Sequence, residues 1–235
     1  NVLWDLIKVF SFIKSYFKKK KSHDVLKLLN SGDLFFDIGA HLGEKSKKIL
    51  DKNLKVVMLE PLPQCVKQLK ESFKNIKNVE ILEKAVGRTV GNMTLEVNSK
   101  MPTISTMAKH WKNGRFSNQK WDQIISVEVT TLDHLIKIYG LPNYIKIDVE
   151  GFELDVLLGL SQKAGIISFE FTSEFLDQSI KCLSHLKKIG YSEFNLSIGE
   201  SRKFFFEWAN ADNLILNLTN ESKKNKLLWG DIYCK

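Results

Sequence analysis

The chain is poor in arginine. Only Arg88, Arg115 and Arg202 occur among its 235 residues, although the formal net charge is +8, so lysine carries nearly all of the positive charge. Recognition of base edges and of paired phosphate oxygens favours the planar arginine side chain. We therefore expect no nucleic-acid partner, and we interpret the basic balance as a solvated surface that attracts acidic groups.

Cysteine is also scarce. Cys65, Cys182 and Cys234 lie far apart, form no C-x-x-C pair and have no histidine at a metal-binding spacing. Three unpaired thiols suit a reducing compartment and argue against a zinc site made of cysteines. The sequence therefore predicts a cytoplasmic protein.

An uninterrupted apolar stretch is missing at the N-terminus. The segment NVLWDLIKVFSFIKSYFKKKK repeats apolar residues at helical spacing, but Asp5, Lys8 and Lys14 break it, so it is not expected to cross a bilayer. We predict an N-terminal helical extension over residues 1–30. Three roles stay open for it: packing on its own domain, contact with a second copy or partner, and peripheral binding to a membrane surface.

The rest of the chain, residues 31–235, alternates strand and helix signals. A composition of 43% hydrophobic and 26% charged residues is ordinary for a globular domain of this length. The alternation predicts an α/β fold with a doubly wound, mostly parallel seven-stranded sheet. Five apolar segments are the expected parallel strands: LFFDIG, KVVMLEP, VEILEKAVG, YIKIDV and GIISFEFT.

Three further features depart from this alternation. MTLEV and ISVEVTTL are predicted to form an antiparallel excursion, and YSEFNL and NLILNL an antiparallel hairpin at the C-terminal edge of the sheet. Residues 98–123 are polar yet contain Trp111, Phe116 and Trp121. Long insertions in compact folds are usually either functional lids or mobile surface, so a lid that faces the substrate and a mobile surface loop both stay open.

The first strand ends in a glycine turn, FFDIGAHLGEKS. Gly39 and Gly43 allow the backbone to bend sharply and to approach a ligand, but they do not form the G-x-G-x-x-G motif of dinucleotide sites. Asp37 precedes the turn, and a carboxylate there is unfavourable for a pyrophosphate. Glu60 ends the second strand about 20 residues later, where an acid can accept ribose hydroxyls. These features together predict S-adenosyl-L-methionine, a nucleoside with an amino acid and a positive sulfur.

Five segments carry a resemblance to a known family. They occur in the family's order, cover roughly residues 33–172, and resemble the FkbM-type S-adenosylmethionine-dependent methyltransferases, which are class I enzymes with a Rossmann-like fold. The block IKIDVEGFE followed by VLLG is the most diagnostic part. The segments are FFDIGAHLGEKS, LEPLPQCVKQL, VEILEKAVG, TTLDHLIKIYG and YIKIDVEGFELDVLLG.

The resemblance also implies positions for the cofactor. His41 stands where the family often has asparagine, which affects a side-chain contact but not the turn. The residues implied to contact the cofactor are Asp37, Gly39, Ala40 and Gly43 at the methionine end, Glu60 and Pro61 at the ribose, Ala85 and Val86 at the adenine, and Asp148 beside the methyl group.

Acidic residues cluster at the end of the fourth strand. Asp148 interrupts an apolar run, where an unpaired charge is costly, and Glu170 does the same in the fifth strand. We predict catalytic roles for Asp148, Glu150 and Glu170, although a place in the N-cap region of the next helix stays open for Glu150. A divalent cation such as Mg²⁺ is expected to be held by Asp148 and Glu170. Glu153 and Asp155 are expected to stabilise the start of the following helix.

The predicted activity is methylation of a hydroxyl group on a sugar, glycan or related natural product. This acceptor class comes from the family resemblance. Two alternatives stay open: methylation of nitrogen in a peptide or amide, and a non-catalytic cofactor-binding module tethered by its basic N-terminal helix. A metal-dependent hydrolase is disfavoured because no histidine stands at the predicted strand ends.

Overall fold

The computed structural model describes residues 25–201 and 203–235. The predicted N-terminal extension lies outside these residues, except for residues 25–30, which include the short 3₁₀ helix η2 at Val25–Leu28. No helix within the described ranges is long and apolar enough to span a lipid bilayer.

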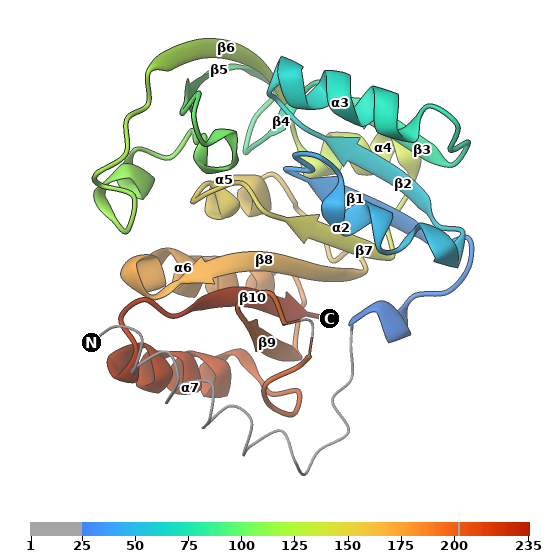
Figure 1. The fold of residues 1–235 in the computed structure, drawn as a ribbon. Coiled ribbons are helices and arrows are strands. Elements are labelled where there is room, and N and C mark those ends of the chain that lie inside the picture. The colour runs from blue at the N-terminus through green and yellow to red at the C-terminus, as the bar shows by residue number, and fades with distance from the viewer. Residues whose placement is uncertain (1–24, 202) are drawn as a thin grey trace.

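A seven-stranded mixed sheet forms the centre of the domain (Figure 1). The strand order is β3-β2-β1-β7-β8-β10-β9, and all pairings from β3 to β8 are parallel, while β10 runs antiparallel to both of its neighbours. The predicted doubly wound sheet is thus confirmed. Its strands are β1 (Leu34–Ile38), β2 (Lys55–Leu59), β3 (Val79–Leu82), β7 (Tyr144–Ile147), β8 (Ile166–Thr172), β9 (Phe194–Ile198) and β10 (Trp229–Cys234).

The strand order reverses between β1 and β7. The chain builds outward from β1 through β2 to β3, and then returns to add β7 on the other side of β1. Ligands of open α/β sheets bind beyond the carboxyl ends of the strands at such a reversal. The topology therefore places the expected site at the ends of β1 and β7.

A small second sheet contains the predicted antiparallel excursion. The strands β5 (Gly91–Val97) and β6 (Gln123–Thr130) pair antiparallel as expected, and β4 (Ala85–Val86) joins β6 in parallel. The predicted single strand VEILEKAVG is therefore divided: its first half is β3 in the main sheet and its second half is β4. Ala85 and Val86 are buried, and Ala85 packs with apolar side chains of β5 and β6 such as Leu95 and Val129.

The C-terminal edge of the sheet is antiparallel, as predicted, but the predicted hairpin is wrong, because a helix separates the two strands. NLILNL lies in the helix α7 (Ala211–Lys224), and the partner of β9 is β10. Asn210 caps α7 by accepting a hydrogen bond from the backbone N–H of Asn213, and Leu214 and Leu218 are buried one turn apart. These helical signals prevail over the alternation of Asn and Leu.

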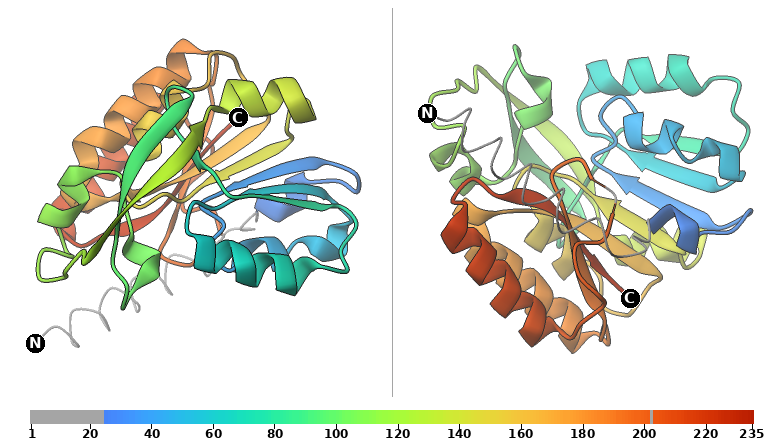
Figure 2. Two further views of the ribbon diagram at one scale, coloured as in Figure 1. Left: turned by 90° about the horizontal axis from the view of Figure 1, so that it is seen from above. Right: turned by 60° about the horizontal axis from the view of Figure 1, so that its bottom comes forward.

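Helices cover both faces of the main sheet, as Figure 2 shows. Phe36, Ile147 and Phe169 face a core shared with α4 to α7, whereas Phe35 and Met58 face a second core with α3. The expected helix GEKSKKILDK is broken into α2 and η3. The helices not yet given bounds are α2 (Glu44–Lys47), η3 (Leu50–Lys52), α3 (Pro63–Phe73), η4 (Pro102–Ile104), η5 (Lys109–Asn113), α4 (Leu132–Tyr139), α5 (Glu153–Leu158), η6 (Ser173–Phe175) and α6 (Leu176–Lys188).

Candidate active site

A cavity of about 420 Å³ opens at the strand-order reversal. Its wall is made by the turn after β1, the ends of β2 and β7, the strand β4, and the segment 102–107. This volume lies within the usual range for small-molecule sites. The predicted site residues in the wall are Gly39, Ala40, Glu60, Pro61, Ala85, Val86, Asp148 and Glu150.

The glycine turn after β1 needs both of its glycines. Gly39 has φ 79°, and a Cβ atom there would lie 1.9 Å from the backbone oxygen of Asp148. Gly43 has φ 74°, and its Cβ would lie 2.6 Å from the ring of Phe73, so Gly43 supports the turn without lining the cavity. The backbone N–H groups of Gly39 and Ala40 both donate to the carbonyl of Leu59, at 2.9 and 3.0 Å. The turn therefore shapes the wall but does not present these amides to an anion.

Asp37 lies below this turn. Its side chain is 1% exposed, and Oδ2 accepts a hydrogen bond from the Ser46 hydroxyl at 2.6 Å, whereas Oδ1 has no partner among the described residues. Burial raises the pKa of Asp37. The predicted contact with the methionine end stays a prediction, because Asp37 does not line the cavity.

Glu60 is a fixed carboxylate at the end of β2. Its side-chain oxygens accept hydrogen bonds from the backbone N–H groups of His41, at 2.8 Å, and Leu62, at 2.9 Å. Burial raises the pKa of Glu60 to about 7. Each carboxylate oxygen can accept more than one hydrogen bond, so Glu60 keeps acceptor capacity for hydroxyl groups of a ligand.

The opposite part of the wall is apolar. Ala85 and Val86 of β4 are 4% and 1% exposed, and Leu95 and Met107 line the cavity beside them. Such a surface suits a flat, mostly apolar ring system. The predicted adenine position is therefore compatible with the geometry.

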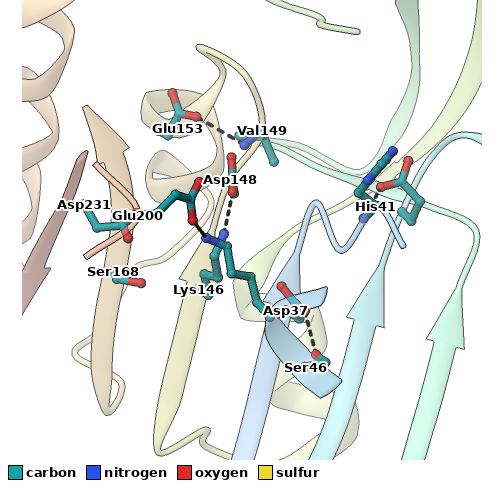
Figure 3. A network of polar contacts seen from close by, with 12 residues as sticks. Asp37, His41, Ser46, Lys146, Asp148, Val149, Glu153, Ser168, Glu200 and Asp231 are labelled. Carbon is teal, nitrogen blue, oxygen red and sulfur yellow. Dashed lines mark hydrogen bonds and ion pairs between the residues drawn. The ribbon is translucent and has the colours of Figure 1, made fainter. Parts of the chain in front are cut away.

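The end of β7 carries a buried ion pair that the sequence analysis missed (Figure 3). Lys146 Nζ lies 2.6 Å from Asp148 Oδ2, and the two side chains are 7% and 31% exposed. Burial alone would raise the pKa of Asp148, but the Lys146 ammonium, together with Lys45 and His41, outweighs burial and lowers this pKa. Burial likewise acts to lower the pKa of Lys146, but the surrounding carboxylates of Asp148, Asp231 and Asp37 outweigh it and raise this pKa.

These groups share one face of the sheet. Asp37 in β1 is directly opposite Lys146 in β7, and Asp231 in β10 is directly opposite Glu170 in β8. Because side chains two residues apart in a strand point the same way, Lys146 and Asp148 also share that face. The sheet therefore gathers charged side chains from four strands at one end.

Glu150 is held in an unusual backbone conformation. Its φ of 54° is left-handed, which costs free energy for a residue other than glycine. The Thr106 hydroxyl donates to the Glu150 carbonyl oxygen at 2.6 Å, and the Trp111 ring packs against Gly151. Burial raises the pKa of Glu150 well above its ordinary value. The predicted lid segment thus fixes the turn that carries Glu150.

The three predicted catalytic acids come together. Asp148, Glu150 and Glu170 each present a carboxylate oxygen such that all three atoms lie within 4.8 Å of one another. Glu170 reaches this point from β8, although it lines a smaller cavity behind the main one. Burial raises the pKa of Glu170 well above its ordinary value.

The remaining two acids of the segment have other partners. Glu153 Oε1 accepts hydrogen bonds from the backbone N–H groups of Val149 and Gly151, both at 3.2 Å. Asp155 forms an ion pair with Arg88 at 3.2 Å. Both contacts fit the structural role at the start of α5 that the sequence predicts.

A sequence signal existed for Lys146 but not for Asp231. Lys146 is a charged residue inside an apolar strand and stands two positions before Asp148, which places both on one face. Asp231 belongs to β10, a strand that the sequence pattern did not predict.

Comparison with known proteins identifies the family. Residues 37–208 match the methyltransferase FkbM domain, which is most of the chain. The chain belongs to the FkbM family of methyltransferases. It is therefore an S-adenosylmethionine-dependent methyltransferase, and the match extends past residue 172, where the resemblance seen in the sequence ended.

Solved structures with a similar fold have low sequence identity to this FkbM-family protein. Precorrin-6y C5,15-methyltransferase from Geobacter metallireducens shares 14% identity at a TM-score of 0.47, covering 89% of this chain and 85% of that one. Fibrillarin from Aeropyrum pernix, solved with S-adenosyl-L-methionine, shares 9% identity at a TM-score of 0.48, covering 90% and 72%. A TehB-like S-adenosylmethionine-dependent methyltransferase from Corynebacterium glutamicum shares 11% identity at a TM-score of 0.44, covering 99% of this chain and 98% of that one. No curated protein sequence matches the chain.

The cavity fits the cofactor of the family. Its wall offers a fixed acid, Glu60, for hydroxyl groups, and an apolar surface at Val86 for a ring. Asp148 lines the same wall, and its pKa is lowered, so its carboxylate suits a ligand with positive charge. The N–H groups of Gly39, Ala40 and Gly43 already donate to backbone carbonyls, so a phosphate group gains little from them.

Proposed function

We propose that this protein transfers the methyl group of S-adenosylmethionine to a hydroxyl group of a sugar, glycan or related natural product. The observation that carries the proposal is the meeting of Asp148, Glu150 and Glu170 beside the cofactor-sized cavity. A hydroxyl acceptor must lose its proton during methylation, and a carboxylate of this group can accept that proton.

In the proposed complex, the residues that hold the cofactor are those of the cavity wall. Glu60 accepts hydrogen bonds from the ribose hydroxyls, and Ala85 and Val86 flank the adenine. The Gly39 turn and Asp37 surround the methionine end. When bound, S-adenosylmethionine supplies a methyl group on a positively charged sulfur, which leaves as a neutral thioether. Holding the acceptor close and in line supplies much of the rate acceleration in such a transfer.

The acids act on the acceptor side. Asp148 already forms an ion pair with Lys146, which fixes its position, while Glu150 lines the cavity from the turn that Thr106 holds. A carboxylate of the cluster accepts the hydroxyl proton directly, or a divalent cation such as Mg²⁺ at Asp148 and Glu170 makes the hydroxyl more acidic. Both routes use the same residues.

Partners and location form a further part of the proposal. The acceptor is a small molecule or a glycan, and the cytoplasm remains the predicted location, with Cys65, Cys182 and Cys234 as buried free thiols. A membrane or dimer contact through the N-terminal helix concerns residues outside the described ranges.

The acceptor is found by transfer of labelled methyl from S-adenosylmethionine to a panel of glycosides, glycans and peptides. We expect label in hydroxyl-bearing sugars, and nuclear magnetic resonance of the product distinguishes an O-methyl from an N-methyl group. A labelled peptide amide with no labelled sugar would contradict the assignment of a hydroxyl acceptor. Glu150→Gln should reduce transfer while leaving cofactor binding close to that of the wild type.

A further inference from the structure

Three carboxylates from separate parts of the chain converge on one point. Asp148 comes from the end of β7, Glu150 from the turn that follows, and Glu170 from β8, and their ligand atoms lie within 4.8 Å of one another. Lys146 pairs with Asp148, so these four groups, when ionised, leave a net charge of −2. Charge of one sign in a partly buried place is costly, and protonation of the acids or a bound cation relieves it.

Unsatisfied polar atoms lie beside Glu170, one member of this cluster. Glu170 Oε2 is shielded from solvent and has no hydrogen-bond partner in the part of the chain that the structure describes. The Trp111 indole N–H and the Thr172 hydroxyl belong to side chains that are 4% exposed, and they too lack a partner among residues 25–201 and 203–235. All three residues line one small cavity of about 20 Å³, which is large enough for a water molecule.

The Trp111 indole also faces the acids. It is close enough to the Glu150 carboxyl to influence the pKa of that group, although the described atoms form no hydrogen bond of good geometry there. Buried polar groups without partners are rare in proteins, and several around one acidic cluster indicate a missing polar ligand. Polar groups behind a metal site commonly bond to its carboxylates or to its bound water.

We propose that Asp148, Glu150 and Glu170 bind a divalent cation of the Mg²⁺ and Mn²⁺ class, each through one carboxylate oxygen. Such ions prefer oxygen ligands at about 2.0–2.1 Å in octahedral geometry, which separates ligand atoms by about 3 to 4 Å. The three oxygens can meet that requirement within their limit of 4.8 Å. An octahedral ion then keeps about three positions for water or for oxygens of an acceptor.

The consequence for catalysis rests on the proposed function, but the binding of the cation does not. If the acceptor hydroxyl joins the ion, its proton becomes easier to remove. The Trp111 N–H and the Thr172 hydroxyl are then available to bond to water or to a carboxylate at the ion.

The test is a titration of the protein with Mn²⁺ in the absence of cofactor and acceptor. The electron paramagnetic resonance signal of the unbound ion measures how much Mn²⁺ is bound. We expect one saturable site, and Glu170→Gln and Glu150→Gln should each weaken it roughly tenfold or more. Both substitutions keep the side-chain shape and remove a partly buried charge, and thermal unfolding confirms that each variant is folded. Glu193→Gln, which changes an exposed glutamate next to β9, is the matched control and should bind like the wild type.

Two results would overturn the proposal: no bound Mn²⁺ at millimolar concentration, or equal binding by wild type and both glutamine variants. A parallel titration with S-adenosylmethionine in the presence of a chelator tests the cofactor site by itself. A failure of the cation site is thereby distinguished from a failure of the methyltransferase assignment.

Discussion

Replacing Lys146 by methionine should destabilise the protein by about 3 kcal/mol. Removing one member of a buried ion pair typically costs about 3–5 kcal/mol, because the other charge is left without compensation. The Lys146 side chain is 7% exposed and Asp148 is 31% exposed, so partial hydration of Asp148 places the cost at the lower end. Domains of this kind have a total stability of about 5–15 kcal/mol, so the loss is easily measured.

The pH dependence of this effect follows from both members of the pair. The folded pKa of Lys146 is above the ordinary 10.5, so its contribution is complete below that pH and is lost only as the pH rises through the folded value. The folded pKa of Asp148 is below the ordinary 3.8, so its contribution is present above that pH and is lost on acidification through the folded value. The wild-type pair should therefore stabilise the fold throughout the neutral range.

Urea denaturation at neutral pH measures the free energy of unfolding, and Lys187→Met serves as the control. Lys187 pairs with Asp212 at 3.2 Å, but these side chains are 58% and 75% exposed, so its loss should cost at most about 1 kcal/mol. The double variant Lys146→Met with Asp148→Asn should recover part of the stability, because no unpaired carboxylate is left at position 148. Equal costs for Lys146→Met and Lys187→Met would refute the reasoning.

Three other substitutions test separate parts of the site. Gly39→Ala should lower the free energy of unfolding by about 2 kcal/mol or more and weaken cofactor binding, because the new Cβ would lie 1.9 Å from the Asp148 carbonyl oxygen. Urea denaturation measures the loss, and a stability equal to that of the wild type would contradict the tight turn. Cofactor affinity should rise about tenfold from about pH 6 to about pH 8, because Glu60, with its pKa of about 7, ionises over this range. Calorimetry on Glu60→Gln should show an affinity that does not change with pH. A rise that persists in Glu60→Gln would assign the effect to another group. Thr106→Val removes the hydrogen bond to the Glu150 carbonyl and should cost about 1 kcal/mol in stability. The variant should slow methyl transfer more than it weakens cofactor binding. An unchanged transfer rate would show that the lid segment has no role in the reaction.

The parallel part of the fold could be predicted because its strands are mostly apolar and are buried on both faces. Runs such as LFFDI and YIKI are buried by helices on each side of the sheet and end at turns with glycine or acidic residues. The C-terminal part was harder to predict. NLILNL alternates like a strand but becomes helical through the Asn210 cap, and the Asp231 charge inside β10 hid that strand.

Some features of the site could be predicted from the sequence, and others could not. Strand-end acids such as Asp148 and Glu170 could be predicted to meet, because the carboxyl ends of neighbouring parallel strands lie together. The contacts of Thr106 and Trp111 with the Glu150 turn depend on how a long insertion folds back over the sheet, and no local pattern specifies that. Lys146 had a signal, since a charge inside an apolar strand needs a partner two residues along or on a neighbouring strand.

Calorimetric titration with S-adenosylmethionine tests the central claim most directly. We expect one saturable site per chain, and Glu60→Ala should weaken it by roughly tenfold, the loss of one or two charge-assisted hydrogen bonds. Absence of binding by the folded wild type at cofactor concentrations near those in cells would contradict the account.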